Sequence, residues 1–389
     1  MLKTNVCIIG SGPAGITASL FLSQKQIPHI VVDKDIFPRH KVCGECYDGR
    51  VTRIINEIDP TLIPDMLEKN IIQHTFNYTL LRKPGKVFNI VSKSTKKTPR
   101  IQTERWYFDD YLLKVAKKSP YLQFYDNQTV VNVEKKEDGF LVSTRADELQ
   151  IEASFLIMAC GSDSRLSKNF LGDYRPSSPN QFIFERLYFQ LQGPFPDKSV
   201  TIHYRIKPFA HAFVICPTPG NKVNIELAID RVSYQKHKPD LAALIREFVS
   251  ENLFSPEVFE GAEEIYKPMG ATMTLHNPAL SYTGERYIII GDAAFSSNPL
   301  AGLGVGQSMT MGKMAALTIA DCIESGAYDK GRFEVFERQI RKRFASEMMQ
   351  GKIITNLFRS PKLMDSLFAL ATFSPWLSGK ISKLLSRFF

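Results

Sequence analysis

A glycine-rich turn close to the start of the chain constrains the fold more than any other feature. Residues 5–9 (Asn-Val-Cys-Ile-Ile) form a short, β-branched apolar run, which is typical of a buried parallel strand. Gly10, Gly12 and Gly15 follow with the spacing G-x-G-x-x-G. The first glycine permits a tight turn, the second lets backbone N–H groups approach a pyrophosphate, and the third lets the next helix pack close to the strand. The segment therefore predicts a strand–turn–helix unit that binds phosphate groups.

The residues after this turn complete the pattern of a dinucleotide site. Pro13 and Ala14 lead into a helix predicted to run to about residue 26, whose N-terminus suits a diphosphate. A second strand, residues 29–33, ends in Asp33, 18 residues after Gly15, and Lys34 follows it. A carboxylate at that place can accept hydrogen bonds from ribose hydroxyls. We interpret the unit as an adenine dinucleotide site, the alternative being a βαβ unit with a structural role alone.

Composition and charge exclude several other classes of protein. The 389 residues suffice for two domains, and 44% hydrophobic content is ordinary for a globular chain. No run of 18 apolar residues predicts a membrane span, and the first strand begins too early for a signal peptide, so we expect a cytoplasmic protein. The net charge of +9 is scattered and accompanies no nucleic-acid-binding motif, so no nucleic acid partner is expected.

The basic excess is greatest at the C-terminus. Residues 352–389 contain six Lys or Arg against the single acid Asp365, with apolar residues between them. One interpretation is an amphipathic helix that makes peripheral contact with an anionic membrane. The interpretation we favour is a set of helices packed on the main domain with a solvated basic face.

A second glycine-rich segment begins where another buried strand, residues 286–290, ends. Gly291 and Asp292 come directly after it, and Pro299, Gly302, Gly304 and Val305 precede or open a helix of small residues. The strand places the carboxylate at the sheet edge where ligands of open α/β sheets bind. The glycines let backbone approach a flat ring, and the helix N-terminus favours negative charge, which a reduced flavin carries. A glycine-rich loop without a ligand is the alternative.

Four motifs in this order resemble those of a known family. Besides the two glycine segments, they are a loop with Phe37, Pro38, Arg39, Lys41, Cys43 and Gly44, and a helix start with Arg105, Phe108 and Asp109. The chain resembles the FAD-dependent oxidoreductases with the para-hydroxybenzoate hydroxylase type of fold, most closely the geranylgeranyl reductase-like branch. The resemblance implies FAD as cofactor, with Arg105 and Asp292 contacting its pyrophosphate or ribityl region. Where the family has Asp-Gly, this chain has Cys160-Gly161, which leaves Gly161 in the expected site but changes a polar contact.

We therefore expect an α/β fold with a discontinuous Rossmann-like FAD-binding domain, a mixed β-sheet substrate cap and a helical C-terminal region. The expected boundaries are 1–74, 98–170 and 263–325 for the FAD-binding domain, 75–97 and 171–262 for the cap, and 326–389 for the helical region. No second dinucleotide fingerprint is present, so NAD(P)H is expected to bind only transiently as the reductant.

Cysteine and histidine residues offer few further sites. Cys43 and Cys46 have the spacing of a redox pair, but Cys43 already belongs to the loop motif, so we expect Cys46 to be incidental. A zinc site would need two more ligands, and none is suggested, so no metal is expected. His203 and His211 fall in the cap and are expected to be structural rather than to face substrate.

The expected chemistry is hydride movement through the flavin, acting on an apolar small molecule, with a lipid among the candidates. A reductase of C=C bonds is favoured, partly because Phe295 stands where aromatic-ring hydroxylases usually have His. A monooxygenase of a natural-product pathway is the first alternative, and a flavin-bound partner without turnover is the second. Halogenation is disfavoured because the two tryptophans, Trp106 and Trp376, lie far apart. The sequence assigns no catalytic residue and no oligomeric state. Several cap residues would line an apolar pocket or form a sheet core: Phe182, Phe184, Tyr188, Phe189, Tyr204, Phe209 and Phe213.

Overall fold

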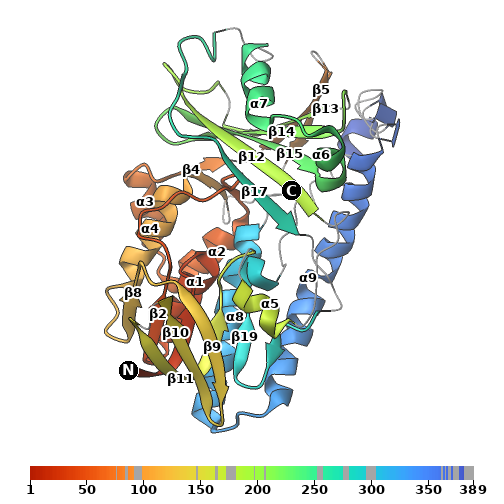
Figure 1. Cartoon of the computed structure of the whole chain (residues 1–389). Coiled ribbons are helices and arrows are strands. Elements are labelled where there is room, and N and C mark those ends of the chain that lie inside the picture. The colour runs from red at the N-terminus through yellow and green to blue at the C-terminus, as the bar shows by residue number, and fades with distance from the viewer. Residues whose placement is uncertain are drawn as a thin grey trace.

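The computed structural model describes residues 1–75, 77–83, 86–91, 99–145, 148–162, 165–171, 181–196, 198–205, 207–251, 257–274, 280–294 and 304–360, and shorter pieces between 362 and 380. Two large sheets form two parts of the molecule, one below the other in Figure 1, and a long C-terminal helix runs beside both. The predicted α/β fold with a mixed FAD-type sheet, a second sheet domain and C-terminal helices is confirmed.

The lower sheet is mixed, and its centre is parallel. Its strand order is β18 (Thr283–Gly284), β19 (Tyr287–Ile289), β11 (Gln150–Met158), β1 (Leu2–Ile9), β2 (His29–Val32) and β8 (Leu122–Tyr125). An antiparallel pair, β9 (Val130–Lys136) and β10 (Gly139–Thr144), joins it through β11. The apolar runs that predicted buried strands form its centre: Val6, Ile8, Leu156 and Ile288 are fully buried.

The first helix is held very close to this sheet on one side and to another helix on its other side. Helix α1 (Pro13–Gln24) follows β1 and packs against α8 (Gly304–Ser325). A Cβ atom on Gly15 would lie 1.9 Å from the carbonyl oxygen of Gly10, and one on Gly312 would lie 2.3 Å from that of Ala14. Only glycine fits at either contact, so these two residues set how closely α1 approaches the sheet and α8.

Four further helices and a small sheet complete the lower part. The helices are α2 (Gly49–Ile58), α3 (Leu62–Glu68), α4 (Arg105–Ala116) and α5 (Arg165–Phe170). The small sheet has the order β3 (Cys46–Tyr47), β7 (Arg100–Thr103) and β4 (Ile72–Thr75). Through β3, the loop after Asp33 is hydrogen-bonded to the strand that leads into α4.

The upper sheet, here called the cap sheet, is mainly antiparallel. Its order is β16 (Glu263–Glu264), β12 (Gln181–Gln190), β15 (Lys222–Asp230), β14 (His211–Thr218), β13 (Val200–Arg205), β5 (Asn77–Lys83) and β6 (Lys86–Val91), and β17 (Met269–Thr274) also pairs with β12. Helices α6 (Arg231–His237) and α7 (Leu241–Ser250) cover one face, where Leu187, Ile225 and Phe248 belong to a separate apolar core. The other face is turned toward the lower part (Figure 1).

Helix α9 (Lys330–Arg359) runs along the side of the molecule (Figure 1). Its N-terminal half packs on the lower part through Phe333, Phe336 and Phe344. No helix in the described part of the chain is long and apolar enough to span a membrane.

Candidate functional site

The glycine turn and Asp33 are in direct contact. Gly10 has a φ of +100° and donates its N–H to the carbonyl of Val32 at 2.7 Å, which joins the turn to the end of β2. Asp33 Oδ2 accepts hydrogen bonds from the backbone N–H of Ser11 at 2.6 Å and from its Oγ at 2.8 Å. The carboxylate thus lies at the carboxyl edge of the sheet, beside the N-terminus of α1.

The space over this turn fits the diphosphate of a dinucleotide. A Cβ on Gly12, the N-cap of α1, would have only Arg39 Nη2 near it, at 3.7 Å. Nε and Nη1 of Arg39 are buried and have no hydrogen-bond partner; the nearest carboxylate oxygens, on Asp35 and Asp109, lie 3.5 and 3.3 Å away. Arg39 is thus ion-paired, but these donors keep hydrogen-bonding capacity beside a helix N-terminus, which makes them complementary to phosphate oxygens. On this observation the residues present fit the cofactor that the sequence predicts.

Arg105 lies in the same region but is engaged with a neighbouring side chain. Its Nε and Nη2 donate to the two carboxylate oxygens of Asp109, at 2.8 and 2.5 Å, and both residues are buried. Asp109 also faces Arg39, so it holds the two arginines together. The contact of Arg105 with FAD stays a prediction.

The second glycine segment meets the first. A Cβ on Gly291 would lie 3.1 Å from that of Ala14, so the turn after β19 touches the start of α1. Asp292 is half-buried in a short 3-10 helix (Gly291–Ala294), and Gly304 and buried Val305 begin α8. Pro299 and Gly302, as well as Phe295, lie outside the described residues.

Three other predicted residues lie around these motifs. Pro13 is buried as the first residue of α1. A Cβ on Gly161, which has a φ of +79°, would lie 3.8 Å from Nζ of Lys41. Lys34 is exposed and pairs with Asp35 at 3.0 Å, so the structure does not join it to the group.

The loop with Cys43 and Gly44 is bound to the cap sheet. Nδ2 of Asn224, on β15, donates to the carbonyl of Cys43 at 2.8 Å, and a Cβ on Gly44 would lie 3.1 Å from Oε2 of Glu226. Glu45 follows with a φ of +60°, and its Oε1 accepts the backbone N–H of Arg105 at 3.0 Å. The predicted cofactor loop is therefore the place where the two parts of the molecule meet.

The two cysteines of this loop lack the setting of a thioredoxin-like pair. Both are free thiols; Cys46 lies in β3, and the following helix begins only at Gly49. Burial raises the pKa of the Cys43 thiol to about 11, against a smaller opposite effect of Arg105. A thiol with that pKa is protonated near neutral pH and is a poor nucleophile.

Four polar side chains on the cap sheet face this loop; the sequence analysis named Tyr188 only as a candidate pocket or core residue and did not name the other three. They alternate with the core residues under α7 along β12 and β15: Arg186, Tyr188, Asn224 and Glu226. Nε of Arg186, the hydroxyl of Tyr188 and Oδ1 of Asn224 are buried without a hydrogen-bond partner. Buried polar groups are nearly always satisfied, so this cluster is suited to a ligand or to ordered water. The sequence did contain one signal for this cluster. Each of the two strands, in which apolar and polar residues alternate, carries a charged residue, Arg186 or Glu226.

Two carboxyl groups lie at the same meeting point. Burial raises the pKa of Glu226 to about 7, although the Arg186 guanidinium opposes this change. Burial raises the pKa of Glu45 well above its ordinary value, and its Oε2 is buried without a hydrogen-bond partner. Burial thus favours the protonated form of both carboxyl groups, and Arg186 opposes it at both.

The aromatic cap residues fall on two different faces. One set lies on the inward face, the face that also carries Arg186: Phe182, Phe184 and Tyr188 on β12, and Tyr204 on β13. Phe189, Phe209 and Phe213 belong to the core under α7. His203 and His211 also lie on that side, with their rings near Phe248 and Phe213. The prediction of an apolar pocket thus applies to the first set alone.

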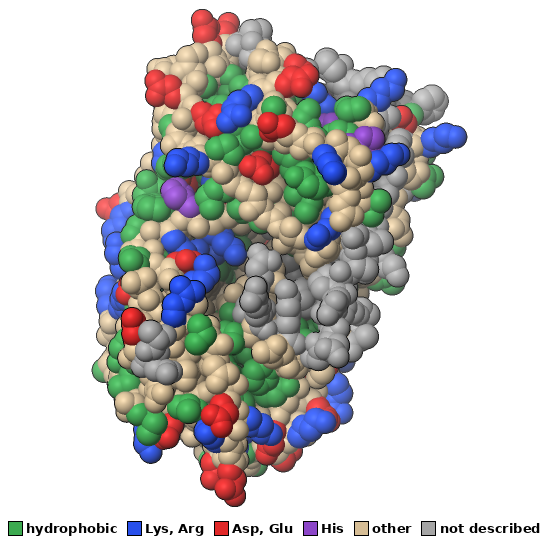
Figure 2. All heavy atoms as spheres, in the orientation of Figure 1, with side chains coloured by type: hydrophobic (Ala, Val, Ile, Leu, Met, Phe, Trp, Pro, Cys, Tyr) green, Lys and Arg blue, Asp and Glu red, His purple; other side chains and the backbone are tan. Residues whose placement is uncertain are grey.

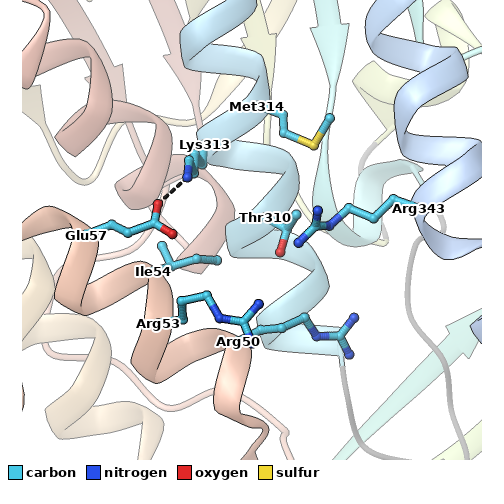
Figure 3. Close-up of a pocket in the computed structure, with 8 residues that line it drawn as sticks. All are labelled: Arg50, Arg53, Ile54, Glu57, Thr310, Lys313, Met314 and Arg343. Carbon is cyan, nitrogen blue, oxygen red and sulfur yellow. Dashed lines mark hydrogen bonds and ion pairs between the residues drawn. The ribbon is translucent and has the colours of Figure 1, made fainter. Parts of the chain in front are cut away.

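Surface features add little to this site. Lys and Arg side chains gather at the waist between the two parts (Figure 2). A surface pocket of about 380 Å³ lies between α2, α8 and α9, and Figure 3 shows its lining residues: Arg50, Arg53, Ile54, Glu57, Thr310, Lys313, Met314 and Arg343. Arg50 already pairs with Asp48 and Glu347, and Lys313 with Glu57, so we assign no ligand there. In the part of the chain that the structure describes, no cluster of His, Cys, Asp or Glu could hold a metal ion.

Comparisons with known proteins agree with this geometry. The family model described as "FAD binding domain" matches residues 3–351. Digeranylgeranylglycerophospholipid reductase 1 of Methanosphaera stadtmanae is 24% identical over 87% of this chain and 80% of its own. The flavin-dependent halogenase otaD of Aspergillus carbonarius is 24% identical over 84% of this chain and 70% of its own.

Solved structures show the same fold. A geranylgeranyl bacteriochlorophyll reductase-like protein from Thermoplasma acidophilum has a TM-score of 0.81 at 16% identity, covering 100% of both chains. The flavin-dependent brominase Bmp2 has a TM-score of 0.75 at 21% identity, covering 99% of both chains. With the glycine turns, Asp33 and the matched family model, these findings lead to one conclusion: the chain belongs to the FAD binding domain family and is an FAD-dependent oxidoreductase.

Proposed function

We propose that the protein reduces a C=C bond of an apolar small molecule bound between the cofactor loop and the inward face of the cap sheet. The observation that carries this proposal is the buried carboxyl group of Glu45 at that meeting point: its Oε2 has no hydrogen-bond partner, and burial raises its pKa well above the ordinary value. Reduction of an alkene requires a proton in addition to a hydride, and bound FAD in its reduced form supplies the hydride. A buried carboxyl group with a raised pKa suits a general acid, and Oε2 of Glu45 is the oxygen that would hold the proton, because Oε1 accepts the N–H of Arg105.

The remaining residues of the site bind the parts of FAD. Arg39 and the N-terminus of α1 hold the diphosphate, and Asp33 holds the ribose. Asp292 and the start of α8 lie on the flavin side, with Gly304 and Val305. In this proposal the FAD-binding domain comprises residues 1–74, 98–170 and 280–325, and the cap comprises 75–97 and 171–274. The predicted boundary at residue 263 lies too early, because β16 and β17 both pair with β12 in the cap sheet. NAD(P)H is the transient reductant.

The relatives support the reductase over the other two activities. Several curated relatives that match this chain over 80% or more of their own length are digeranylgeranylglycerophospholipid reductases, which by name act on a lipid. Other relatives are halogenases, but this chain has two tryptophans 270 positions apart and no paired tryptophan motif. A lipid substrate would fit a protein that contacts a membrane through its C-terminal region, and the described side chains of Leu363, Leu370 and Trp376 there are more than half exposed.

The decisive experiment follows the flavin under two conditions. Protein purified with FAD is reduced with NAD(P)H under argon and mixed with isoprenoid alkenes while flavin absorbance at 450 nm is recorded. Anaerobic reoxidation with formation of the saturated product is the expected result, and Glu45→Gln should slow it while leaving FAD bound. Reoxidation that occurs only with oxygen and inserts an oxygen atom into the substrate would establish a monooxygenase instead. Colourless protein that binds no added FAD would overturn the assignment of the cofactor site.

A further inference from the structure

The inward face of the cap sheet contains a buried positive charge without a matching negative one. Arg186 is 3% exposed, and in the described chain no carboxylate lies within ion-pair distance of its guanidinium. Its Nη2 lies 3.4 Å from the thioether sulfur of Met269, and its Nε has no hydrogen-bond partner. A buried cation in such surroundings is costly unless an anion or several hydrogen bonds compensate it.

The cross-strand neighbour of Arg186 does not provide that compensation. Glu226 lies directly opposite Arg186 in the pairing of β12 with β15, where side chains on one face are close. Arg186 instead leans over the ring of Tyr188, 4.8 Å from its centroid. No described residue forms a hydrogen bond or ion pair with the carboxyl group of Glu226. The two groups are therefore near each other but unpaired.

Arg186 has no ion-pair partner among the described residues. On the loop, burial raises the pKa of Glu45 although Arg186 opposes this change, burial raises the pKa of the Cys43 thiol to about 11, and burial together with Arg186 lowers the pKa of His40. Across the site, Glu104 is paired with Lys222 at 2.7 Å. A single charge matches a monoanion, whereas a phosphate dianion would need a second cation.

We propose that Arg186, Tyr188 and Glu226 bind the carboxylate of the substrate, so that the substrate is an apolar molecule carrying one carboxylic acid group. Nε of Arg186 and the hydroxyl of Tyr188 are free donors, and a protonated Glu226 offers a third. The apolar remainder lies along the same face, where Phe182, Phe184 and Tyr204 are buried. This inference rests on the proposed function, because it takes this face as the substrate site.

The test compares acids with their alcohols on the FAD-loaded protein. The probes are decanoate and 1-decanol, geranate and geraniol, and decyl phosphate, with affinities measured by calorimetry at pH 6.5. In the wild type, at least one acid should bind about ten- to hundredfold more tightly than its alcohol, as expected for a charge-assisted hydrogen bond in a buried site. Arg186→Met should remove that difference while changing alcohol affinity less than threefold. Tyr188→Phe should reduce it in part.

The control is Arg246→Met, which removes a cap arginine that lies on α7 and pairs with Glu264. It should keep the full preference for acids. FAD content and the flavin reduction potential of Arg186→Met should match the wild type; a shifted potential with a retained acid preference would mean that Arg186 faces the flavin. Equal binding of acids and alcohols, no binding by any acid, or tighter binding of decyl phosphate than of decanoate would each overturn the proposal. Acid binding that depends on Arg186 without anaerobic reoxidation by alkenes would leave this inference standing and remove the reductase.

Discussion

Asp33 is expected to have two separable roles, one in the apoprotein and one toward FAD. In the apoprotein its Oδ2 accepts both donors of Ser11, and its Oδ1 accepts the N–H of Asp35 at 2.9 Å. Ser11 is fully buried, so Asp33→Ala leaves its N–H and hydroxyl without a partner. Each such loss costs about 1–3 kcal/mol, and we expect a total of about 2–4 kcal/mol because the loop relaxes in part.

The second role is measured by FAD affinity. Loss of a carboxylate that accepts ribose hydroxyls should weaken binding by about 1.5–3 kcal/mol, or roughly ten- to hundredfold. Titration of apoprotein with FAD, followed by quenching of flavin fluorescence, gives the affinity, and urea unfolding of the apoprotein gives the stability.

Ser11→Ala is the matched control, since it removes one hydrogen bond to Asp33 but keeps both the carboxylate and the N–H contact. It should lower apoprotein stability by about 1 kcal/mol and change FAD affinity by less than threefold. An equal loss of FAD affinity in both variants would show that Asp33 acts only by positioning the turn. Unchanged affinity in Asp33→Ala would show that another residue holds the ribose.

Four other predictions concern the helices, the loop, the cap and the tail. Gly312→Ala should destabilise the protein by about 1–3 kcal/mol in thermal or urea unfolding, because the new Cβ meets the backbone of Ala14. Gly379→Ala is the control: its new Cβ would have no atom within 4 Å, so this change should be neutral or stabilising. Cys46→Ser should retain flavin reduction and turnover, and native Cys43 should react slowly with iodoacetamide at pH 7; a changed thiol count on substrate addition would contradict this. Burial raises the pKa of Glu226 from 4.5 to about 7 in the folded state, so the folded protein should lose stability as pH rises between those values, by up to about 3 kcal/mol. Glu226→Gln should flatten that part of the plot of unfolding free energy against pH, and an unchanged slope would refute the assignment. Any affinity for anionic liposomes should be carried by the tail: flotation of the full chain at low salt should weaken at high salt and when Lys380, Lys383 and Arg387 are neutralised, and flotation that survives both changes would contradict this. A chain that stays in the aqueous fraction at low salt would show that the tail is ordinary packed helix.

The FAD-binding half of the molecule was predictable because its signals are local. Gly10, Gly15 and Asp33 lie within one βαβ unit, and the geometry of that unit is set by near neighbours in sequence. The strands and helices followed from apolar periodicity in the same way. The contact between Gly291 and Ala14 was not predicted, because the two residues are far apart in the chain and only the fold brings them together.

The cap cluster could not be predicted for a physical reason. Alternation in β12 and β15 predicts strands and shows that Arg186 and Tyr188 share a face, but it does not tell whether solvent or another domain covers that face. Here the loop at Cys43 covers it, and residues with the pattern of a solvated surface become buried. The ion pair of Arg105 with Asp109 escaped prediction for a related reason, because only the fold shows which carboxylate a buried arginine meets.

The order of strands in the lower sheet has a consequence for synthesis of the chain. Strand β1 is made first, yet its neighbour β11 begins at Gln150, and β11 in turn waits for β19, which begins at Tyr287. At a translation rate of about 5–20 residues per second, roughly 15–60 s separate the first strand from the last one of its sheet. The apolar edge of β1 lies open until β11 has been made, and the edge of β11 then lies open until β19 follows. Since Asp292 comes later still, the residues of the expected FAD site are complete only when most of the chain has been synthesised, so bound cofactor cannot protect these edges earlier.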